Sequence, residues 1–158
     1  MKWNTLLTST EKVNDTSLKN ADASTKVSNL ALHYYKGVKT LTFTGEIKSS
    51  VKAAKYSCIV TFTKVDADEN LTDEEVMQGF YPKPSLSEND IQVRCSCPSY
   101  RFRYSYQNSR NSASTGSKVK AYTSKHMRPS VNPKNLPGVC KHLIEFVNYL
   151  VENGFIFE

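Results

Sequence analysis

The sequence predicts an α+β fold in which a small antiparallel sheet is joined to a C-terminal helix. Two segments between residues 41 and 65 alternate apolar and polar side chains, a pattern typical of half-buried strands. Residues 143–151 instead repeat apolar side chains at helical spacing. Three of the four cysteines and one of the three histidines stand in two close pairs, one after a predicted strand and the other where the helix begins.

The two alternating segments predict neighbouring antiparallel strands. In the first, apolar positions alternate with Thr42, Thr44 and Glu46; these apolar residues are Leu41, Phe43 and Ile47. In the second, one face carries Tyr56, Cys58, Val60 and Phe62. Because successive side chains of a strand point to opposite faces, one face of each strand is expected to be buried. Cys58 has apolar neighbours on its face and is predicted to be a core residue.

A short helix is expected next, followed by a third strand. Thr72 and Glu75 stand three residues apart before Val76, which is a capping-box pattern. Pro82 and Pro84 end this helix. The third strand begins near Asp90 and reaches the cysteines; if it stays extended past Pro98, the aromatic residues from Tyr100 to Tyr106 face one way and Arg101 and Arg103 the other.

The chain divides into two predicted parts. Residues 1–30 are rich in Ser, Thr, Asn, Asp and Lys, so we expect an N-terminal arm or a segment that orders on a partner. Residues 31–158 are expected to form one α+β domain with a long loop at 107–135, which is polar and lacks periodicity. The helix after this loop is expected to end near Asn153 and Gly154.

Charge and hydropathy limit the class of protein. No run of about 18 apolar residues is present, and the polar N-terminus lacks the apolar core of a signal peptide, so we expect no membrane partner and synthesis inside a cell. The net charge is +6, yet residues 91–142 hold ten Lys or Arg and no Asp or Glu. The positive charge therefore belongs to the segment that holds the paired cysteines.

The two pairs predict a zinc site. Cys95 and Cys97 lie two apart and share one face of an extended chain, whereas Cys140 and His142 open the predicted helix. Close cysteine pairs in a reducing compartment are more often metal ligands than disulfides, and four sulfur or imidazole donors make a closed, structural zinc site. We therefore expect Zn²⁺ on Cys95, Cys97, Cys140 and His142, tying the helix back to the sheet. His126, in the loop, is a spare candidate ligand.

The ligand pattern resembles a known motif. A C-x-C pair followed by a C-x-H pair is the pattern of the SWIM-type zinc finger, matched here by Cys95-Ser-Cys97 and Cys140-Lys-His142. The 42 residues between Cys97 and Cys140 exceed the usual spacing of that finger. The wider strings "CSCPSYRFRYSYQ" and "RPSVNPKNLPGVCKHL" resemble small virion-associated proteins of tailed bacteriophages. This resemblance implies a structural or assembly protein of a phage particle, made in the host cytoplasm and bound to other virion proteins.

Two other functions fit parts of the sequence. Cys140 and His142 superficially offer a nucleophile and a base, but residues two apart on a helix do not face each other, so we expect no enzyme and no small-molecule substrate. The alternative is a zinc-stabilised nucleic-acid-binding module that uses the basic segment 91–142. Its candidate contacts, to nucleic acid or to a protein partner, are Arg101, Arg103, Lys118, Lys120, Lys125 and Arg128.

Overall fold

A computed structural model describes the chain except for residues 14–18, 20, 22–25, 50–52, 67–69 and 122–130. Its helices and strands are, in chain order, α1 (Trp3–Val13), β1 (Val27–Tyr35), the 3-10 helix η1 (Lys36–Val38), β2 (Thr40–Lys48), β3 (Lys55–Thr63), α3 (Asp73–Met77), β4 (Asp90–Cys95), α4 (Pro98–Arg103), α5 (Ser105–Arg110) and α6 (Lys141–Glu152). The architecture is α+β, as predicted.

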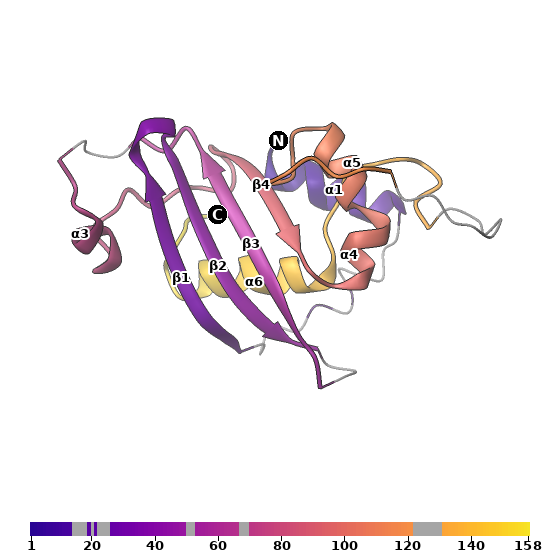
Figure 1. Cartoon of the computed structure of the whole chain (residues 1–158), viewed down its shortest axis with the longest axis horizontal. Helices are drawn as coiled ribbons and strands as arrows, with labels where there is room; N and C mark the ends of the chain where they lie inside the picture. Colours follow the sequence, from indigo (N-terminus) through magenta and orange to yellow (C-terminus); the bar gives the residue numbers. More distant parts are fainter. Residues whose placement is uncertain (14–18, 20, 22–25, 50–52, 67–69, 122–130) are drawn as a thin grey trace.

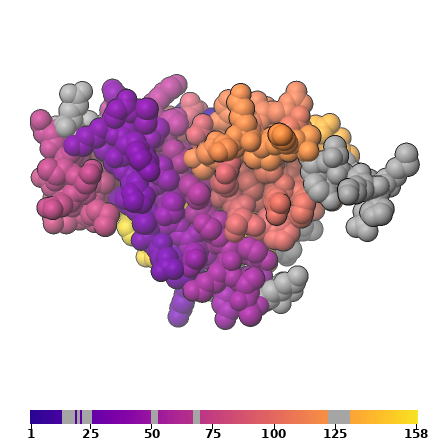
Figure 2. Space-filling model, in the orientation of Figure 1, coloured from indigo at the N-terminus to yellow at the C-terminus, as the bar shows by residue number. Residues whose placement is uncertain are grey.

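The four strands among the described residues form one antiparallel sheet in the order β1-β2-β3-β4. Helix α6 lies across one face of this sheet, and α1, α4 and α5 gather beyond β4, whereas α3 lies beside β1 (Figure 1). In the same orientation the space-filling view shows the opposite face of the sheet, with α6 almost hidden behind it (Figure 2). The sheet therefore buries one face against α6 and presents its other face to solvent.

The buried face follows the alternation read from the sequence. The side chains of Leu41, Phe43 and Ile47 in β2, and of Val60 and Phe62 in β3, are fully buried. Residues paired across these strands continue the same face into β4, where Val60 lies opposite Val93. The antiparallel pairing of β2 with β3 and the burial of Cys58 confirm the sequence prediction.

Helix α6 packs closely on β2 because of a glycine. A Cβ atom at Gly45 would lie 2.7 Å from Cε2 of Phe146 and 2.8 Å from Cγ1 of Val27. Real Cβ atoms do not approach other atoms so closely, so only glycine lets the Phe146 ring lie against the strand. The C-terminal helix occupies the predicted segment, and its apolar stripe, including Leu143, Val147 and Leu150, is buried.

The short helix α3 also begins as expected. The Thr72 hydroxyl accepts a hydrogen bond from the Glu75 amide at 3.2 Å, and the Glu75 carboxylate accepts one from the Thr72 amide at 2.8 Å. These bonds satisfy two amide groups that a helix start otherwise leaves without partners.

The expectation that residues 1–30 form an N-terminal arm or a partner-ordered segment was wrong for residues 3–13 and for residues 27–30, which begin β1. Residues 3–13 form helix α1, and Trp3, Leu6 and Thr10 are buried. Trp3 and Leu6 belong to the same core cluster as the sheet and α6. Although the composition is polar, residues three or four apart put these side chains on one stripe, which is enough to bury a helix against an existing core.

The chain does not stay extended after Pro98, so the condition for side-chain alternation there is not met. Residues 98–103 and 105–110 are helices α4 and α5. Pro98 occupies the first turn of α4, where its fixed φ fits a helix and its missing amide proton costs nothing. Tyr100 and Tyr104 are therefore one helical turn apart and both buried, whereas Phe102 is 45% exposed.

The segment expected to be a loop at 107–135 begins with helical residues. Its first residues belong to α5, and the chain then runs beside β4, where the Val93 amide donates a hydrogen bond to the Ala113 carbonyl at 2.8 Å. Ser114 forms a parallel bridge with Val93. The sequence did not predict these contacts, because the polar side chains of this segment bind backbone groups instead of forming an apolar stripe.

Candidate metal centre

Four buried side chains form a candidate metal centre between the end of β4 and the start of α6. The donor atoms of Cys95, Cys97, Cys140 and His142 all lie within 4.8 Å of one another. Each of the four side chains is buried. These are the four ligands predicted from the sequence, and the fold brings all of them together. Such separations allow a single metal ion to contact all four donors.

The first pair of donors is positioned by the junction of β4 and α4. Cys95 is the last residue of β4, and the Cys97 amide donates a hydrogen bond to its sulfur at 3.4 Å. Cys97 is the N-cap of α4, and its own sulfur accepts a hydrogen bond from the Tyr100 amide at 3.3 Å. Ser96 bonds in both directions to the backbone of Ser57 in β3. The C-x-C turn is thus held to the sheet.

The second pair is positioned by the start of α6. Cys140 is the N-cap of α6, with an extended backbone, and the amides of Leu143 and Ile144 donate to its carbonyl at 3.1 and 3.2 Å. His142 lies in the first turn of the same helix. A helix amino end carries positive potential, which offsets part of the cost of a negatively charged sulfur at Cys140.

The residues before Cys140 are fastened by buried polar side chains from two other helices. The Thr10 hydroxyl of α1 accepts a hydrogen bond from the Val139 amide at 2.9 Å. Asn108 of α5 accepts from the Gly138 amide at 2.8 Å and donates to the Gly138 carbonyl at 2.9 Å. A Cβ at Gly138 would lie 2.5 Å from the Tyr104 ring, so glycine is required there. The approach to the second donor pair is therefore rigidly held.

His142 carries the observation that best fits a metal. Both of its ring nitrogens are buried, and neither has a hydrogen-bond partner. The Tyr56 ring lies against the imidazole at a tilt of 50°, with its centre 4.9 Å away. A buried polar nitrogen without a partner costs free energy, and a metal ion bound to one of these nitrogens would remove part of that cost.

The electrostatic interactions among the three cysteine sulfurs also fit a bound metal ion. Hydrogen bonds from Cys140, Cys58 and Cys97, in that order, lower the pKa of Cys95. Burial, followed by the interactions with Cys95 and Cys97, raises the pKa of Cys140. Cys140 lowers the pKa of Cys97, but Cys95 and burial outweigh it and raise that pKa to about 12. Negative charge on one of these sulfurs thus opposes negative charge on the others, and a metal cation would offset that repulsion.

A fourth sulfur touches the centre. The Cys58 sulfur lies 3.8 Å from the Cys95 sulfur, and Cys58 is fully buried. The pairing of Cys58 with Cys95 across β3 and β4 produces this contact. The sequence predicted a core position for Cys58 but not its place beside the ligands, because 37 residues separate the two cysteines and only the strand register joins them.

The candidate contacts for an anionic partner are only partly described. Arg101 and Arg103 lie on α4. The Arg101 guanidinium is 5.6 Å from the centre of the Phe102 ring, and the Arg103 guanidinium is 6.0 Å from the centre of the Tyr104 ring. Lys118 and Lys120 are exposed on the segment after α5. Lys125, Arg128 and the spare ligand His126 lie outside the described residues. Arg101, Lys118 and Lys120 are therefore accessible to a partner.

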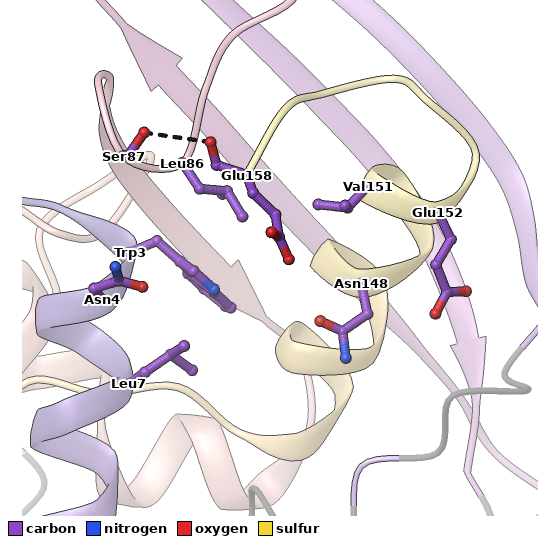
Figure 3. Close-up of a pocket in the computed structure, with 9 residues that line it drawn as sticks. All are labelled: Trp3, Asn4, Leu7, Leu86, Ser87, Asn148, Val151, Glu152 and Glu158. Carbon is purple, nitrogen blue, oxygen red and sulfur yellow. Dashed lines mark hydrogen bonds between the residues drawn. The ribbon is translucent and has the colours of Figure 1, made fainter.

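A separate cleft of about 430 Å³ lies between α1 and α6 (Figure 3). Trp3 and Leu7 point into it from α1, and Val151 and Glu152 line it from α6 (Figure 3). Leu86, Ser87 and Glu158 close one end, where the Ser87 hydroxyl donates to the Glu158 carbonyl at 3.3 Å. Neither a cysteine nor a histidine lines this cleft, so it is distinct from the metal centre.

Among the residues that the structure describes, no helix has both the length and the apolar composition needed to cross a lipid bilayer. The chain matched no profile of a known protein family, no curated protein sequence and no solved structure.

Proposed function

We propose that the centre binds one zinc ion and that this ion is structural. Three cysteine sulfurs and one histidine nitrogen are a donor set typical of structural zinc, and four protein donors leave no position open for a substrate. When bound, the ion would supply cross-linking and charge neutralisation. Cys95 and Cys97 would hold it from the sheet side, and Cys140 and His142 from α6.

We further propose that the protein is a non-enzymatic structural or assembly component of a tailed bacteriophage particle, located in the virion. The observation that supports this proposal is the position, in the fold, of the two sequence strings that resemble phage proteins. Pro98 opens α4, Gly138 admits the Tyr104 ring, and Asn132 binds the backbone of Arg103 and Leu136. The distinctive residues of both strings thus support the donor set, as expected of a shared architectural unit.

The virion proposal is tested by the location of the protein. Particles purified by density gradient from infected cells should contain the chain at a fixed ratio to the major virion proteins, measured by quantitative mass spectrometry. Detection of the chain only in the soluble lysate, with none in intact particles, would contradict it. Sedimentation after nuclease treatment distinguishes binding to virion proteins from attachment through nucleic acid.

The metal is tested by its stoichiometry. Elemental analysis of protein purified without added metal should give one zinc per chain, and Cys97→Ser or Cys140→Ser should abolish this content. Cys58→Ser is the matched control, because it removes a buried cysteine sulfur that is not one of the four ligands, and it should retain one zinc. A metal-free wild-type protein of normal thermal stability would refute the zinc proposal.

A second candidate function is a zinc-stabilised nucleic-acid-binding module. The observation that favours it is that the acid-free segment 91–142 places exposed basic side chains on α4 and beside β4, including Arg101, Lys118 and Lys120. Basic residues of this kind neutralise phosphates and release counterions, so affinity should fall steeply with salt.

This second candidate is tested with single-stranded DNA and RNA oligonucleotides. Neutralising Arg101, Arg103 and Lys120 to Gln should weaken binding at low salt and reduce its salt dependence. Lys55→Gln is the control, because Lys55 lies outside the segment 91–142, on β3, where its amino group is 3.9 Å from the Glu46 carboxylate. Negligible affinity at about 0.15 M salt, where charges are screened beyond about 8 Å, would exclude nucleic acid as the partner.

A further inference from the structure

The contact between Cys58 and Cys95 has the dimensions of a shared metal site. Their sulfurs are 3.8 Å apart. With zinc–sulfur bonds of about 2.3 Å, two thiolates at corners of one tetrahedron are separated by roughly the same 3.8 Å. The same separation is also that of a thiol hydrogen bond from Cys58 to Cys95. Cys58 therefore lies at a distance from Cys95 that suits another ligand of the same ion.

The register of the sheet directs β3 toward the donor set at two points. Cys58 is opposite Cys95 in the antiparallel pair, and both side chains belong to the buried face. Tyr56, two residues earlier and on the same face, lies with its ring centre 4.9 Å from that of His142. One strand thus touches the first ligand with a sulfur and the last ligand with a ring, so Cys58 lies beside the ligand cluster.

The surroundings can accept a further sulfur donor. Cys58 and Cys140 are fully enclosed, and Cys95, Cys97 and His142 are at most 5% exposed, so water does not compete freely for a metal held there. Cys140 lies at the amino end of the 12-residue helix α6, where the helix dipole favours added negative charge. Zinc readily accepts four thiolates, as in Cys₄ sites.

We propose that Cys58, which lies beside the four donors, is a reserve metal ligand that takes the position of His142 when the imidazole is lost. In this exchange the bond from the histidine nitrogen to the metal breaks and a bond from the Cys58 sulfur forms. The Cys58 thiol releases one proton to solvent, and the net charge of the zinc and its ligands changes from −1 to −2 on formal charge counting. This inference rests on the proposed metal function.

The test counts sulfur neighbours of the bound metal by X-ray absorption spectroscopy. Zinc-loaded wild-type protein and Cys58→Ser should both show three sulfurs and one nitrogen. His142→Ala should bind zinc through four sulfurs. The double variant Cys58→Ser/His142→Ala should show three sulfurs and one light atom. Its zinc affinity should be lower than that of His142→Ala. The decrease should exceed the roughly 10-fold to 100-fold loss of metal affinity that follows removal of a residue that only contacts a ligand.

Each outcome separates this inference from the zinc proposal itself. Three sulfurs and one oxygen in zinc-loaded His142→Ala would overturn the reserve-ligand role while leaving the structural zinc intact. If His142→Ala does not fold, His142→Asn, which keeps a polar side chain, is measured in its place. Failure of both variants to bind zinc, while wild-type protein holds one ion, would also overturn it. A metal-free wild-type protein would overturn the proposed function first.

Discussion

Single buried polar side chains determine how accurately the metal centre is held. Thr10, Asn108 and Asn132 each bind backbone groups of the segment that leads to Cys140. All three are at most 4% exposed. Because a buried amide or carbonyl without a partner costs about 1–3 kcal/mol, each of these side chains stabilises one conformation of that segment. The order of a segment with few apolar residues thus depends on individual hydrogen bonds.

Tyr100 gives a prediction about alkaline pH. Burial raises its pKa to about 12, and its hydroxyl donates to the Val93 carbonyl at 2.8 Å. The unfolded chain loses this proton near its ordinary pKa of about 10, so the contribution of Tyr100 to stability is complete below that pH and is lost as pH rises toward 12. The stability advantage of wild type over Tyr100→Phe should therefore shrink by up to about 1.4 kcal/mol per pH unit in this interval.

The measurement is urea unfolding of zinc-loaded protein at several pH values from neutral to pH 12, the value to which the Tyr100 pKa is raised. At neutral pH, Tyr100→Phe should cost about 1–2 kcal/mol because Val93 loses its donor. Tyr35→Phe is the control, since Tyr35 is 55% exposed and should give parallel curves. Parallel curves for Tyr100→Phe as well would contradict the prediction.

Gly45 gives a prediction about packing. Gly45→Ala would place a methyl group within 2.8 Å of both Phe146 and Val27, so α6 must move or the Phe146 ring must turn. Overpacking of this kind typically costs about 1–3 kcal/mol. Chemical denaturation should detect this loss. Gly37→Ala is the matched control, because no atom lies within 4 Å of a Cβ built there, and equal effects of the two substitutions would refute the packing argument.

At the scale of whole elements, α1 supports the metal centre although it contributes no ligand. Its buried residues Trp3 and Leu6 join the core, and Thr10 binds the backbone next to Cys140. The helix is thus packed on one side and bonded to the ligand-bearing segment on the other. Disturbing α1 is therefore expected to affect zinc affinity as well as stability.

Thr10→Val tests this coupling. Valine keeps the shape of threonine but cannot accept the hydrogen bond from the Val139 amide, so the variant should lose about 1–3 kcal/mol of stability and bind zinc more weakly. Zinc affinity is measured by competition with a chromophoric chelator. Thr8→Val, an exposed position on the same helix, should leave both quantities unchanged. A Thr10→Val protein with wild-type zinc affinity would show that α1 and the centre are independent.

In the whole molecule, two regions are stabilised differently. The sheet is stabilised by strand pairing and a buried apolar face, whereas α4 and α5 depend on contacts with other elements. The pairing of β2 with β3 is continuous from Leu41–Phe62 to Lys48–Lys55, and Phe43, Val60 and Phe62 are buried beneath it. Helices α4 and α5 have only six residues each, which is too short to be stable alone. Their stability depends on packing, on the hydrogen bonds of Asn108 and Asn132, and on the proposed metal.

Removal of zinc should therefore loosen the molecule unevenly. With a chelator present, amide hydrogen exchange should accelerate first in α4, in α5 and at the amino end of α6, while the amides of β2 and β3 stay protected. Exchange measured by mass spectrometry, with and without chelator, checks this order, and restoring zinc should reverse it. A uniform increase across the chain would mean that the metal stabilises the entire domain as one cooperative unit.

Local patterns were sufficient for a large part of this structure. The four ligands stand in pairs two residues apart, the capping box of Thr72 and Glu75 lies within one turn, and the apolar residues of β2, β3 and α6 repeat with the period of their element. Each of these features depends on neighbours in sequence, so the sequence alone determined it. The same patterns placed Cys58 in the core, as its burial confirms.

Tertiary structure decided the features that depend on distant contacts. The segment after Pro98 could alternate as a strand, yet it is helical because Cys97 caps α4 and both Tyr100 and Tyr104 find buried positions. Helix α1 has a polar composition and is ordered by a core that other elements supply. The contact of Cys58 with Cys95 arises only from the register of β3 on β4. Local sequence sets which side chains share a face, whereas the face that covers them is chosen by packing across the whole chain.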